Sequence, residues 1–336
     1  MKDVTEIVDV KEEDLKQLDK LISSSCKGTY RSQYSKSYKA DTKYVNTDCV
    51  SLDVLLKGWP VGRVVEFRGG YSSGKSTLCF YLIGAMQKNG YLNMLIDSEA
   101  TYTEDYGKLC GIDTDKLIYL RPDSMEDCIE AIRIGLSSNL IKFIWIDSLS
   151  ALVPSNEVSK DIGGGTLAAR ARLMSTYLPQ IVNLCAKYEA SVIWTNQERT
   201  SSIGGYGPSK AGTGGKALPY YASLILTINK QSYIEDNEKD GHISEITVLK
   251  SKLKAKPFQK ALIPIRYPDE DKGGLDIDTD IINNAIDLGI VQKKGSWYSF
   301  GELKEQGLNN FLKAIDDKVR GKIKEKVYDH INKEES

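Results

Sequence analysis

The stretch Gly69-Gly70-Tyr71-Ser72-Ser73-Gly74-Lys75-Ser76-Thr77 decides the fold, because two glycines with four residues between them are followed directly by Lys-Ser. The run before it, residues 64–67, is short, apolar and rich in residues that favour strands. The run after it, residues 77–87, repeats apolar side chains at helical spacing. A strand that leads through a glycine turn into a helix is the building unit of an α/β fold with a mainly parallel sheet.

Such a turn can bind a triphosphate. Its backbone N–H groups and the positive end of the helix dipole point at one place, where they attract phosphate oxygens. In that arrangement Lys75 reaches the β and γ phosphates, and the hydroxyl of Ser76 binds Mg²⁺. The alternative is a glycine-rich turn without a ligand, but the strand and the helix on its two sides favour a phosphate loop.

Composition limits the class of protein. The chain has 336 residues, of which 41% are hydrophobic and 27% charged, enough for one large α/β domain and a smaller one. With 45 basic and 46 acidic residues the global charge gives no sign of nucleic-acid binding, so any such site must come from local clusters. Six cysteines without a C-x-x-C pair are typical of a reducing compartment and make a structural zinc site improbable on sequence grounds. No signal segment and no run of roughly 18 apolar residues is present, which predicts a soluble, cytoplasmic protein without a membrane segment.

The chain divides into three predicted parts. Residues 1–44 contain a short amphipathic helix over 11–22, with Leu15, Leu18, Leu21 and Ile22 on one face, and an extended linker. That helix is too short to bury its apolar face alone, so it needs a partner surface; the alternative is a mobile tail. Residues 45–268 form the core, and residues 269–336 form a small α/β domain, with helices over 280–288 and 309–331 and a strand over 296–299.

Within the core, short apolar runs alternate with helical stretches. The runs at 64–67, 92–96, 143–146 and 191–195 predict parallel strands with crossover helices on both faces of a twisted sheet. The runs at 222–228 and 243–249 predict a β-rich extension of that sheet.

Polar residues follow three of these strands at the edge where ligands bind in open α/β sheets. Asp147 comes after a buried strand and is expected to hold Mg²⁺ through its water shell. Glu99 could polarise the attacking water, and Gln197 could contact the γ-phosphate. The alternative for each acid is a helix cap, but their combination with the phosphate loop favours a nucleotide site.

Two long loops leave the same edge of the predicted sheet. Residues 199–216 contain six glycines among small polar residues and carry Arg199, Lys210 and Lys216. Glycines let the backbone approach phosphates, the cations neutralise them, and Ile203 or Tyr206 could insert between bases. Residues 155–166, with three consecutive glycines, form a second such loop. The alternative is a pair of plain surface loops.

The chain resembles the bacterial RecA family of ATP-dependent DNA recombinases, including phage-encoded relatives, from about residue 45 to residue 300. Segments 50–56 and 62–66 are similar to the family's approach to the phosphate loop. Tyr106 matches the tyrosine that stacks on adenine. The other matching segments are 69–77, 97–99, 167–175, 196–199, 214–218, 250–252 and 295–299.

The resemblance implies a DNA-dependent ATPase that uses ATP and Mg²⁺, forms a homo-oligomeric helical filament on single-stranded DNA, and pairs it with homologous double-stranded DNA. It also implies an N-terminal oligomerisation helix and a place on the nucleoid, or in the host cytoplasm for a phage protein. The catalytic residues it implies are Glu99, Gln197, Lys250 and Lys252, the lysines acting on the ATP of the neighbouring subunit. The implied nucleotide-binding residues are Gly69, Gly70, Tyr71, Ser72, Ser73, Gly74, Lys75, Ser76, Thr77, Tyr106, Asp147 and Tyr267, with Ser76 and Asp147 at the metal. The implied DNA-binding residues are Gly165, Leu167, Arg172, Arg199, Ile203, Lys210, Gly214, Gly215 and Lys216.

The sequence also departs from the family pattern. Tyr71 and Thr103 stand where the family commonly has acids, Pro219 replaces a basic residue, and Lys254 is an additional lysine beside the pair at 250 and 252. Two alternatives to a recombinase remain open: a ring-forming motor of the same superfamily, related to replicative helicases, and a non-hydrolysing accessory protein that only scaffolds filaments. The Lys-Ser-Lys at 250–252 argues against the motor, and the presence of Glu99 and Gln197 argues against the scaffold.

Overall fold

The computed structural model describes residues 42–155, 166–197, 216–234, 237–269 and 272–334, together with Glu13, Lys16, Gln17, Lys20, Leu21 and Ser24. The chain forms two compact units, residues 1–42 and residues 43–336. In the first unit the six described positions between residues 13 and 24 are helical, and Leu21 is exposed. The other apolar positions of the predicted N-terminal helix, Leu15, Leu18 and Ile22, lie outside the described residues, as does most of the linker.

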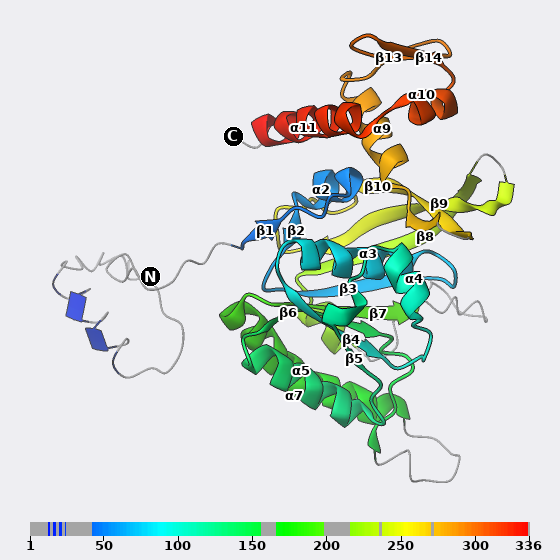
Figure 1. Ribbon diagram of the computed structural model, residues 1–336. Coiled ribbons are helices and arrows are strands. Elements are labelled where there is room, and N and C mark those ends of the chain that lie inside the picture. The colour runs from blue at the N-terminus through cyan, green and yellow to red at the C-terminus, as the bar shows by residue number, and fades with distance from the viewer. Residues whose placement is uncertain are drawn as a thin grey trace, which may run out of the picture. The chain divides into compact units, whose positions relative to one another are not determined.

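A nine-stranded sheet, counted over the described residues, is the centre of the second unit (Figure 1). Its order is β11-β10-β9-β8-β3-β7-β6-β4-β5. Strands β8, β3, β7, β6, β4 and β5 are parallel to their neighbours in that run, and β9, β10 and β11 extend it by antiparallel pairing. The strand bounds are β3 (Val64–Gly69), β4 (Leu92–Asp97), β5 (Leu117–Leu120), β6 (Ile141–Asp147), β7 (Ser191–Gln197), β8 (Leu224–Ile234), β9 (Asn237–Ser251), β10 (Lys260–Asp269) and β11 (Lys272–Leu275).

This arrangement confirms the predicted mainly parallel sheet with a β-rich extension. Sequence reasoning missed β5, β10 and β11. The last strand lies beyond Asp269, and it pairs with β10, so the sheet continues past the predicted core boundary at 268. The domain boundaries themselves stay predictions.

Helices cover both faces of the sheet (Figure 1). Alternate side chains of a strand point to opposite faces, so Val65 and Trp145 pack with α2 (Val50–Leu56) and α3 (Lys75–Lys88), whereas Val64 and Trp194 pack with α5 (Met125–Ser137) and α7 (Thr166–Tyr188). Helix α4 (Glu104–Leu109) lies on the α3 side, and α8 (Ala217–Tyr221) lies on the α7 side. Over the described residues, no helix has the length and hydropathy needed to cross a bilayer.

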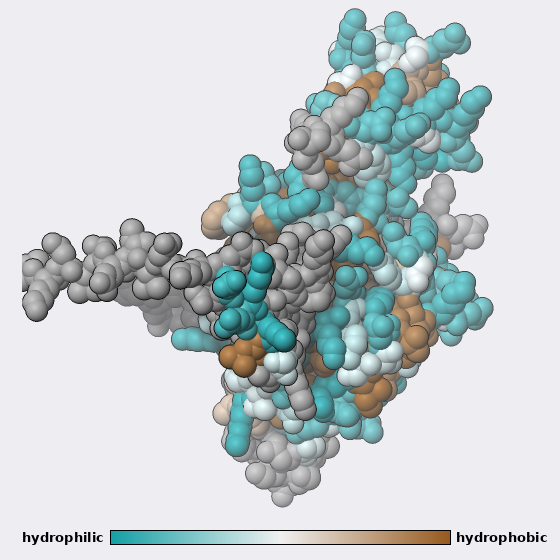
Figure 2. Space-filling view, turned by 90° about the vertical axis from the view of Figure 1, so that its left-hand side faces the viewer, coloured by the Kyte–Doolittle hydropathy of each residue, from teal (hydrophilic) through white to brown (hydrophobic). Residues whose placement is uncertain are grey.

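The C-terminal residues form a small α/β unit around a third core. It contains α9 (Ile277–Asp287), β12 (Gln292–Lys294), β13 (Trp297–Phe300), β14 (Leu303–Gln306), α10 (Leu308–Ala314) and α11 (Asp317–Glu334). The prediction of one helix over 309–331 was wrong. The chain becomes extended at Ile315, and the carboxylate of Asp316 accepts the N–H of Val319, which starts a new helix. Figure 2 shows that this unit, at the top of the view, has a mainly hydrophilic surface.

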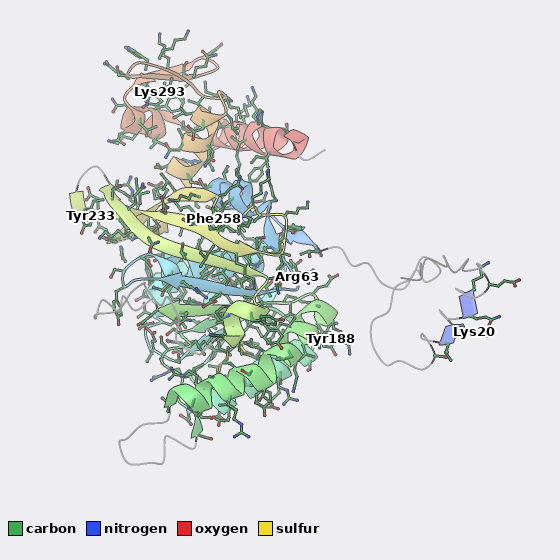
Figure 3. All side chains as sticks on the ribbon, turned by 180° about the vertical axis from the view of Figure 1, so that it is seen from behind. Lys20, Arg63, Tyr188, Tyr233, Phe258 and Lys293 are labelled. Atoms are coloured by element: carbon green, nitrogen blue, oxygen red, sulfur yellow. The ribbon has the colours of Figure 1, made fainter. Side chains whose placement is uncertain are left out.

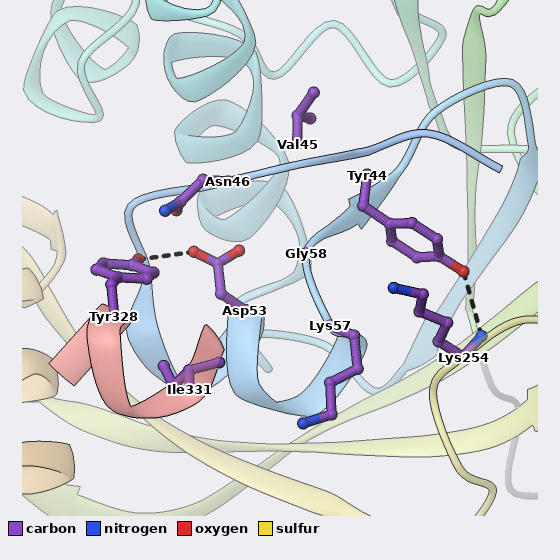
Figure 4. Close-up of a pocket in the computed structure, with 9 residues that line it drawn as sticks. All are labelled: Tyr44, Val45, Asn46, Asp53, Lys57, Gly58, Lys254, Tyr328 and Ile331. Carbon is purple, nitrogen blue, oxygen red and sulfur yellow. Dashed lines mark hydrogen bonds between the residues drawn. The ribbon is translucent and has the colours of Figure 1, made fainter. Parts of the chain in front are cut away.

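Helix α2 joins the core to this C-terminal unit. The backbone N–H of Ser51 donates to Asp280 on α9, and Tyr328 on α11 donates to the buried carboxylate of Asp53 at 2.7 Å. A cavity of about 220 Å³ lies beside this contact, between the first residues of the core and α11 (Figure 4). The remaining elements are β1 (Tyr44–Val45), β2 (Trp59–Pro60) and a short 3₁₀ helix (Thr114–Lys116).

Candidate nucleotide site

The phosphate loop requires glycine at two positions. Gly74 caps the N-terminus of α3 in the left-handed region, with φ 92° and ψ 8°, and a Cβ there would come within 2.7 Å of Ser244 Oγ. A Cβ on Gly69 would collide with the carbonyl oxygen of Ile228 on the neighbouring strand β8. The loop therefore fits closely against β8 and β9, and this fixes where its N–H groups point.

Lys75, the first residue of α3, turns back over the loop. Its Nζ donates to the carbonyl oxygens of Gly69 at 3.1 Å and Gly70 at 2.7 Å. The cation is thereby held at the helix N-terminus, where the macrodipole also favours an anion. This combination of charge, N–H groups and glycine geometry fits the phosphates of a nucleotide, as the sequence predicts.

Ser76 and Asp147 meet next to Lys75. Ser76 Oγ donates to Asp147 Oδ2 at 3.0 Å, and Thr195 Oγ1 donates to Asp147 Oδ1 at 2.7 Å. Burial raises the pKa of Asp147 to about 6, although the bonds from Thr195 and Ser76 oppose that rise and the nearby charge of Glu99 adds to it. A hydroxyl and a carboxylate side by side are hard oxygen ligands, so this donor set suits Mg²⁺, which would also relieve the raised pKa.

Glu99 and Gln197 are in direct contact, although Glu99 follows the end of β4 and Gln197 is the last residue of β7. Gln197 Nε2 donates to Glu99 Oε1 at 3.1 Å, and Ser148 Oγ donates to the same oxygen. Sequence reasoning chose Glu99 and Gln197 separately and gave no role to Ser148. The signal for Ser148 was its position directly after Asp147 on the same strand end.

Asp97 shapes the turn that presents Glu99. One of its oxygens accepts the N–H of Glu99 at 3.1 Å, and the other accepts the N–H of Tyr102 at 3.0 Å and the hydroxyl of Tyr119 at 3.2 Å. Because Asp97 is almost completely buried, these bonds hold its charge in place and fix the backbone of the turn. Sequence reasoning assigned no role to Asp97, which lies two residues before Glu99.

Two of the three tyrosines predicted at the nucleotide, Tyr106 and Tyr267, occupy different places. The hydroxyl of Tyr106 on α4 shares a hydrogen bond of 2.7 Å with Thr77 Oγ1 on α3, and burial raises the pKa of Tyr106 to about 12. Tyr106 thus lies beside the start of α3. Tyr267 on β10 packs its ring 5.5 Å from that of His242, and its hydroxyl accepts from Lys230. It has no direct bond to the phosphate loop among the described residues.

Lys250 and Lys252 do not join Glu99 within one chain. Lys250 Nζ donates to the carbonyl oxygens of Pro219 at 2.6 Å and Ala222 at 3.0 Å, and Lys252 Nζ donates to that of Tyr220 at 3.2 Å. Both lysines therefore bind the C-terminal end of α8, the helix that follows residues 199–216. Burial and the charge of Lys252 lower the pKa of Lys250.

A buried ion pair lies beneath the site and was not anticipated. Arg68 donates from Nε and from a terminal nitrogen to the two carboxylate oxygens of Glu66, both at 2.9 Å. Asn196 Nδ2 adds a third bond to Glu66 at 3.1 Å and so ties β3 to β7 next to Gln197. The bidentate geometry and full burial make this pair a fixed support for both strand ends.

Most predicted DNA-binding residues lie outside the described residues: Gly165, Arg199, Ile203, Lys210, Gly214 and Gly215. Leu167 is in α7, and the structure describes only its backbone. Arg172 on α7 and Lys216 at the start of α8 are exposed. Both undescribed loop segments begin after strands β6 and β7, the strands that carry Asp147 and Gln197, so they start at the edge of the sheet that holds the phosphate loop.

Comparison with known proteins agrees with this geometry. The sequence pattern of the RecA N-terminal domain matches residues 11–291, and that of the RecA C-terminal domain matches residues 279–332. Protein RecA of Chlorobaculum tepidum is 34% identical over 291 residues, which covers 85% of this chain and 83% of that protein. Protein RecA of Leptospira meyeri is 35% identical, covering 86% of this chain and 75% of that protein, and Protein RecA of Helicobacter hepaticus is 33% identical, covering 93% and 91%.

These matches confirm the family resemblance and, together with the observed sheet, the predicted fold. The first domain match alone spans more than half of the residues and includes every strand end that contributes to the site. The chain belongs to the RecA family.

Proposed function

We propose that the chain is a DNA-dependent ATPase that polymerises on single-stranded DNA and exchanges strands with a homologous duplex. The observation that carries this proposal is the contact between Glu99 and Gln197 beside the Ser76–Asp147 pair. This contact joins Glu99, the group suited to activate water, to Gln197. Gln197 lies just before the long segment of residues 199–216, which is rich in glycine and carries three cations. Membership of the RecA family supports the same activity.

The described residues supply the parts that phosphoryl transfer to water needs. Lys75 and the loop N–H groups bind the phosphates, and Ser76 with Asp147 holds Mg²⁺, which when bound neutralises phosphate charge. Glu99 accepts the proton of the attacking water, and Ser148 and Gln197 orient its carboxylate through their bonds to Oε1. Buried Asp97 keeps the turn that carries Glu99 from shifting.

Gln197 couples the nucleotide to the DNA loop in this proposal. Its amide has to divide its hydrogen bonds between Glu99 and the γ-phosphate, so ATP binding changes the conformation of the end of β7. Residues 199–216 follow after Glu198 and carry the cations Arg199, Lys210 and Lys216. A change at the strand end therefore alters how that loop binds DNA phosphates.

Lys250 and Lys252 act in trans in the filament. In the single chain they bind α8 carbonyl oxygens, which keeps both ammonium groups together next to the end of the DNA loop. When the nucleotide of a neighbouring subunit is close, the two lysines can bind its phosphate oxygens in place of the carbonyl oxygens of α8. A hydrogen bond between two charged groups is stronger than one to a neutral carbonyl oxygen. Hydrolysis then depends on assembly.

The outer strand β5 offers a surface for such an assembly. It ends the sheet, and two of its apolar side chains are partly exposed, Ile118 at 38% and Tyr119 at 41%. We assign residues 11–22 of the next copy as the occupant, because the sequence predicts an apolar face there that a helix of this length cannot bury by itself.

Two measurements test the function together. ATP hydrolysis is measured with and without single-stranded DNA, and the assemblies are viewed by electron microscopy. The proposal expects hydrolysis to rise with DNA and helical filaments to form. Closed hexameric rings would instead identify a motor of the same superfamily, and filaments without any ATP turnover would identify a scaffold.

A further inference from the structure

The antiparallel extension of the sheet reaches the back of the phosphate loop through one serine. Ser244 on β9 is almost completely buried, and its Oγ donates to the carbonyl oxygen of Ser73, a residue of the phosphate loop, at 2.8 Å. The same Oγ lies 3.0 Å from His242 Nε2. Two residues of β9, which is distant in sequence, thus contact the phosphate loop at the backbone carbonyl of Ser73.

The direction of these bonds follows from counting protons. A serine hydroxyl has one proton, and here it goes to the carbonyl oxygen of Ser73, which can only accept. Ser244 must therefore accept from His242, so His242 carries its proton on Nε2. In the neutral ring Nδ1 is then bare, and it has no hydrogen-bond partner among the residues that the structure describes.

The surroundings of His242 oppose a second proton. The side chain is only 3% exposed. Tyr267 of β10 covers the ring, Tyr233 lies opposite on β8, and Lys230, also on β8, adds a positive charge nearby (Figure 3 labels Tyr233). Burial, and then the charge of Lys230, lowers the pKa of His242.

There is little space for the loop to relax by itself. Gly74 lies close against strands β9 and β10. A Cβ added there would contact Ser244 Oγ and collide with the side chain of Ile265. Loss of the bond between Ser244 and Ser73 would therefore remove one donor from the loop carbonyl, which the ring of His242 also reaches. A second proton on His242 would place a buried Nδ1–H without an acceptor near the charge of Lys230, and this would destabilise the end of β9 that supports the loop.

We propose that Ser244 and neutral His242 are positioning residues of the phosphate loop, which fix the carbonyl of Ser73 and make nucleotide binding sensitive to acid. Neither residue touches the nucleotide. The chain of bonds from His242 Nε2–H to Ser244 Oγ–H to Ser73 keeps the loop N–H groups aligned for phosphate. The proposal rests on the nucleotide site described above.

Binding of ADP, measured by calorimetry with Mg²⁺ at pH 7.5, tests the serine. Ser244→Ala should weaken ADP binding roughly two- to tenfold, the effect of one hydrogen bond, while Ser244→Thr keeps the hydroxyl and should restore it. Circular dichroism checks that both variants fold. Wild-type affinity in Ser244→Ala overturns the proposal. Lys75→Ala is the separate test of the site itself: if it also binds ADP normally, the nucleotide site is wrong, not only this inference.

The acid sensitivity is tested by repeating the titration between pH 7.5 and 5.5. His242→Gln keeps an N–H that can bond Ser244 but cannot gain a charge, so its affinity should fall less than that of wild type. His330→Gln, a change of the other, exposed histidine, should behave as wild type. Asp147, with a pKa of about 6, also titrates in this range. It is present in all three proteins, so its effect on affinity is the same in each and does not change the comparison. Equal losses in all three overturn the role of His242.

The tautomer gives an independent readout. The chain has two histidines, so ¹⁵N-histidine labelling yields signals from two imidazole rings, and the His242→Gln spectrum identifies those of His242. At pH 7.5 the proposal expects a proton on Nε2 of His242 and a bare Nδ1. A proton on Nδ1 would overturn the proposed direction of the bonds.

Discussion

Gln197 Nε2 donates a hydrogen bond of 3.1 Å to Glu99 Oε1 across 98 positions of the chain. Glu99 follows β4 and Gln197 ends β7, with β6 between these two strands in the sheet. The bond bridges the strand that carries Asp147. The residues that we propose for water activation, for metal binding and for the start of the DNA-binding segment are therefore linked by side chains at one edge of the sheet.

The first prediction concerns Glu99. Glu99→Gln removes the group that takes the proton from water but keeps a side chain of the same shape, so hydrolysis should fall by roughly 10²-fold or more while ATP binding is retained. Single-turnover hydrolysis and equilibrium binding measure the two effects. Glu104→Gln, on the exposed start of α4, is the matched control and should hydrolyse ATP normally. Comparable turnover in the Glu99 variant would reject its role.

Gln197 should affect coupling more than binding. Gln197→Met keeps the length of the side chain but loses the amide that bonds Glu99, so the stimulation of hydrolysis by single-stranded DNA should fall roughly fivefold or more. ATP affinity without DNA should change little, because Lys75 and the loop remain. The ratio of hydrolysis rates with and without DNA is the measurement. An unchanged ratio would show that the loop receives its signal elsewhere.

Lys252 tests whether the site is completed by a neighbour. Lys252→Ala should bind nucleotide but hydrolyse it poorly, and Lys75→Ala should fail at its own phosphate loop. In mixed filaments some junctions pair an intact Lys75 with an intact Lys252, so mixing the two variants should restore part of the activity. Lys256→Ala, a nearby exposed lysine, is the control. No recovery despite proven co-assembly would argue against action in trans.

Asp53 gives a prediction for stability. Burial raises its pKa from 3.8 to about 6, although hydrogen bonds from Thr47 and Tyr328 oppose that rise. Figure 4 shows the bond from Tyr328. A raised pKa means that the folded state holds the proton more tightly. Asp53 therefore adds stability below about pH 4, and this stability is lost as pH rises towards 6, by up to about 3 kcal/mol.

Asp53→Asn removes this titration. The difference in Tm between Asp53→Asn and wild type should therefore shift in favour of the variant as pH rises from 4 to 7. Asp123→Asn, at an exposed position, should show no such trend. A constant difference across this pH range would mean that Asp53 titrates in the folded protein as it does in the unfolded chain.

The sequence predicted those parts of the site that follow from local order. Asp147, Glu99 and Gln197 each lie within three residues of the end of an apolar run. Parallel strands bring such ends to one edge of the sheet. Partners from distant segments carry no local signal: Ser244 bonds to Ser73 across 171 positions, and either residue alone looks like an ordinary polar residue.

Two strands, β10 and β5, were not predicted because their own segments carry weak strand signals. Strand β10 contains Pro264 and Pro268, which argue against a strand in sequence reasoning. Pro264 nevertheless pairs with Ile243 of β9, and Pro268 falls where the pairing with β11 is irregular, between Arg266 and Asp269, a place that tolerates a residue without an N–H. Strand β5 has only four residues, too few to show a period. In both cases the pairing with a neighbouring strand, and not the propensity of the segment, decides the structure.

The last prediction tests DNA binding by residues 199–216. Lys216 is exposed at the start of α8, whereas Arg199 and Lys210 lie outside the described residues. Neutralising all three removes cations from a segment that begins beside Gln197, so single-stranded DNA binding should weaken. The slope of log affinity against log salt should fall by up to roughly 0.7 for each DNA phosphate that the loop no longer neutralises.

Strand exchange should disappear in this triple variant while ATP hydrolysis without DNA survives, because Lys75, Asp147 and Glu99 are untouched. The salt titration is made once with ATP and once with ADP, and the wild-type difference between the two nucleotides should shrink in the variant. Matched neutralisation of Lys318, Lys322 and Lys326 on α11 controls for the removal of three positive charges. If the loop variant binds and exchanges DNA like wild type, residues 199–216 are not the DNA site, and the ATPase core serves a different process.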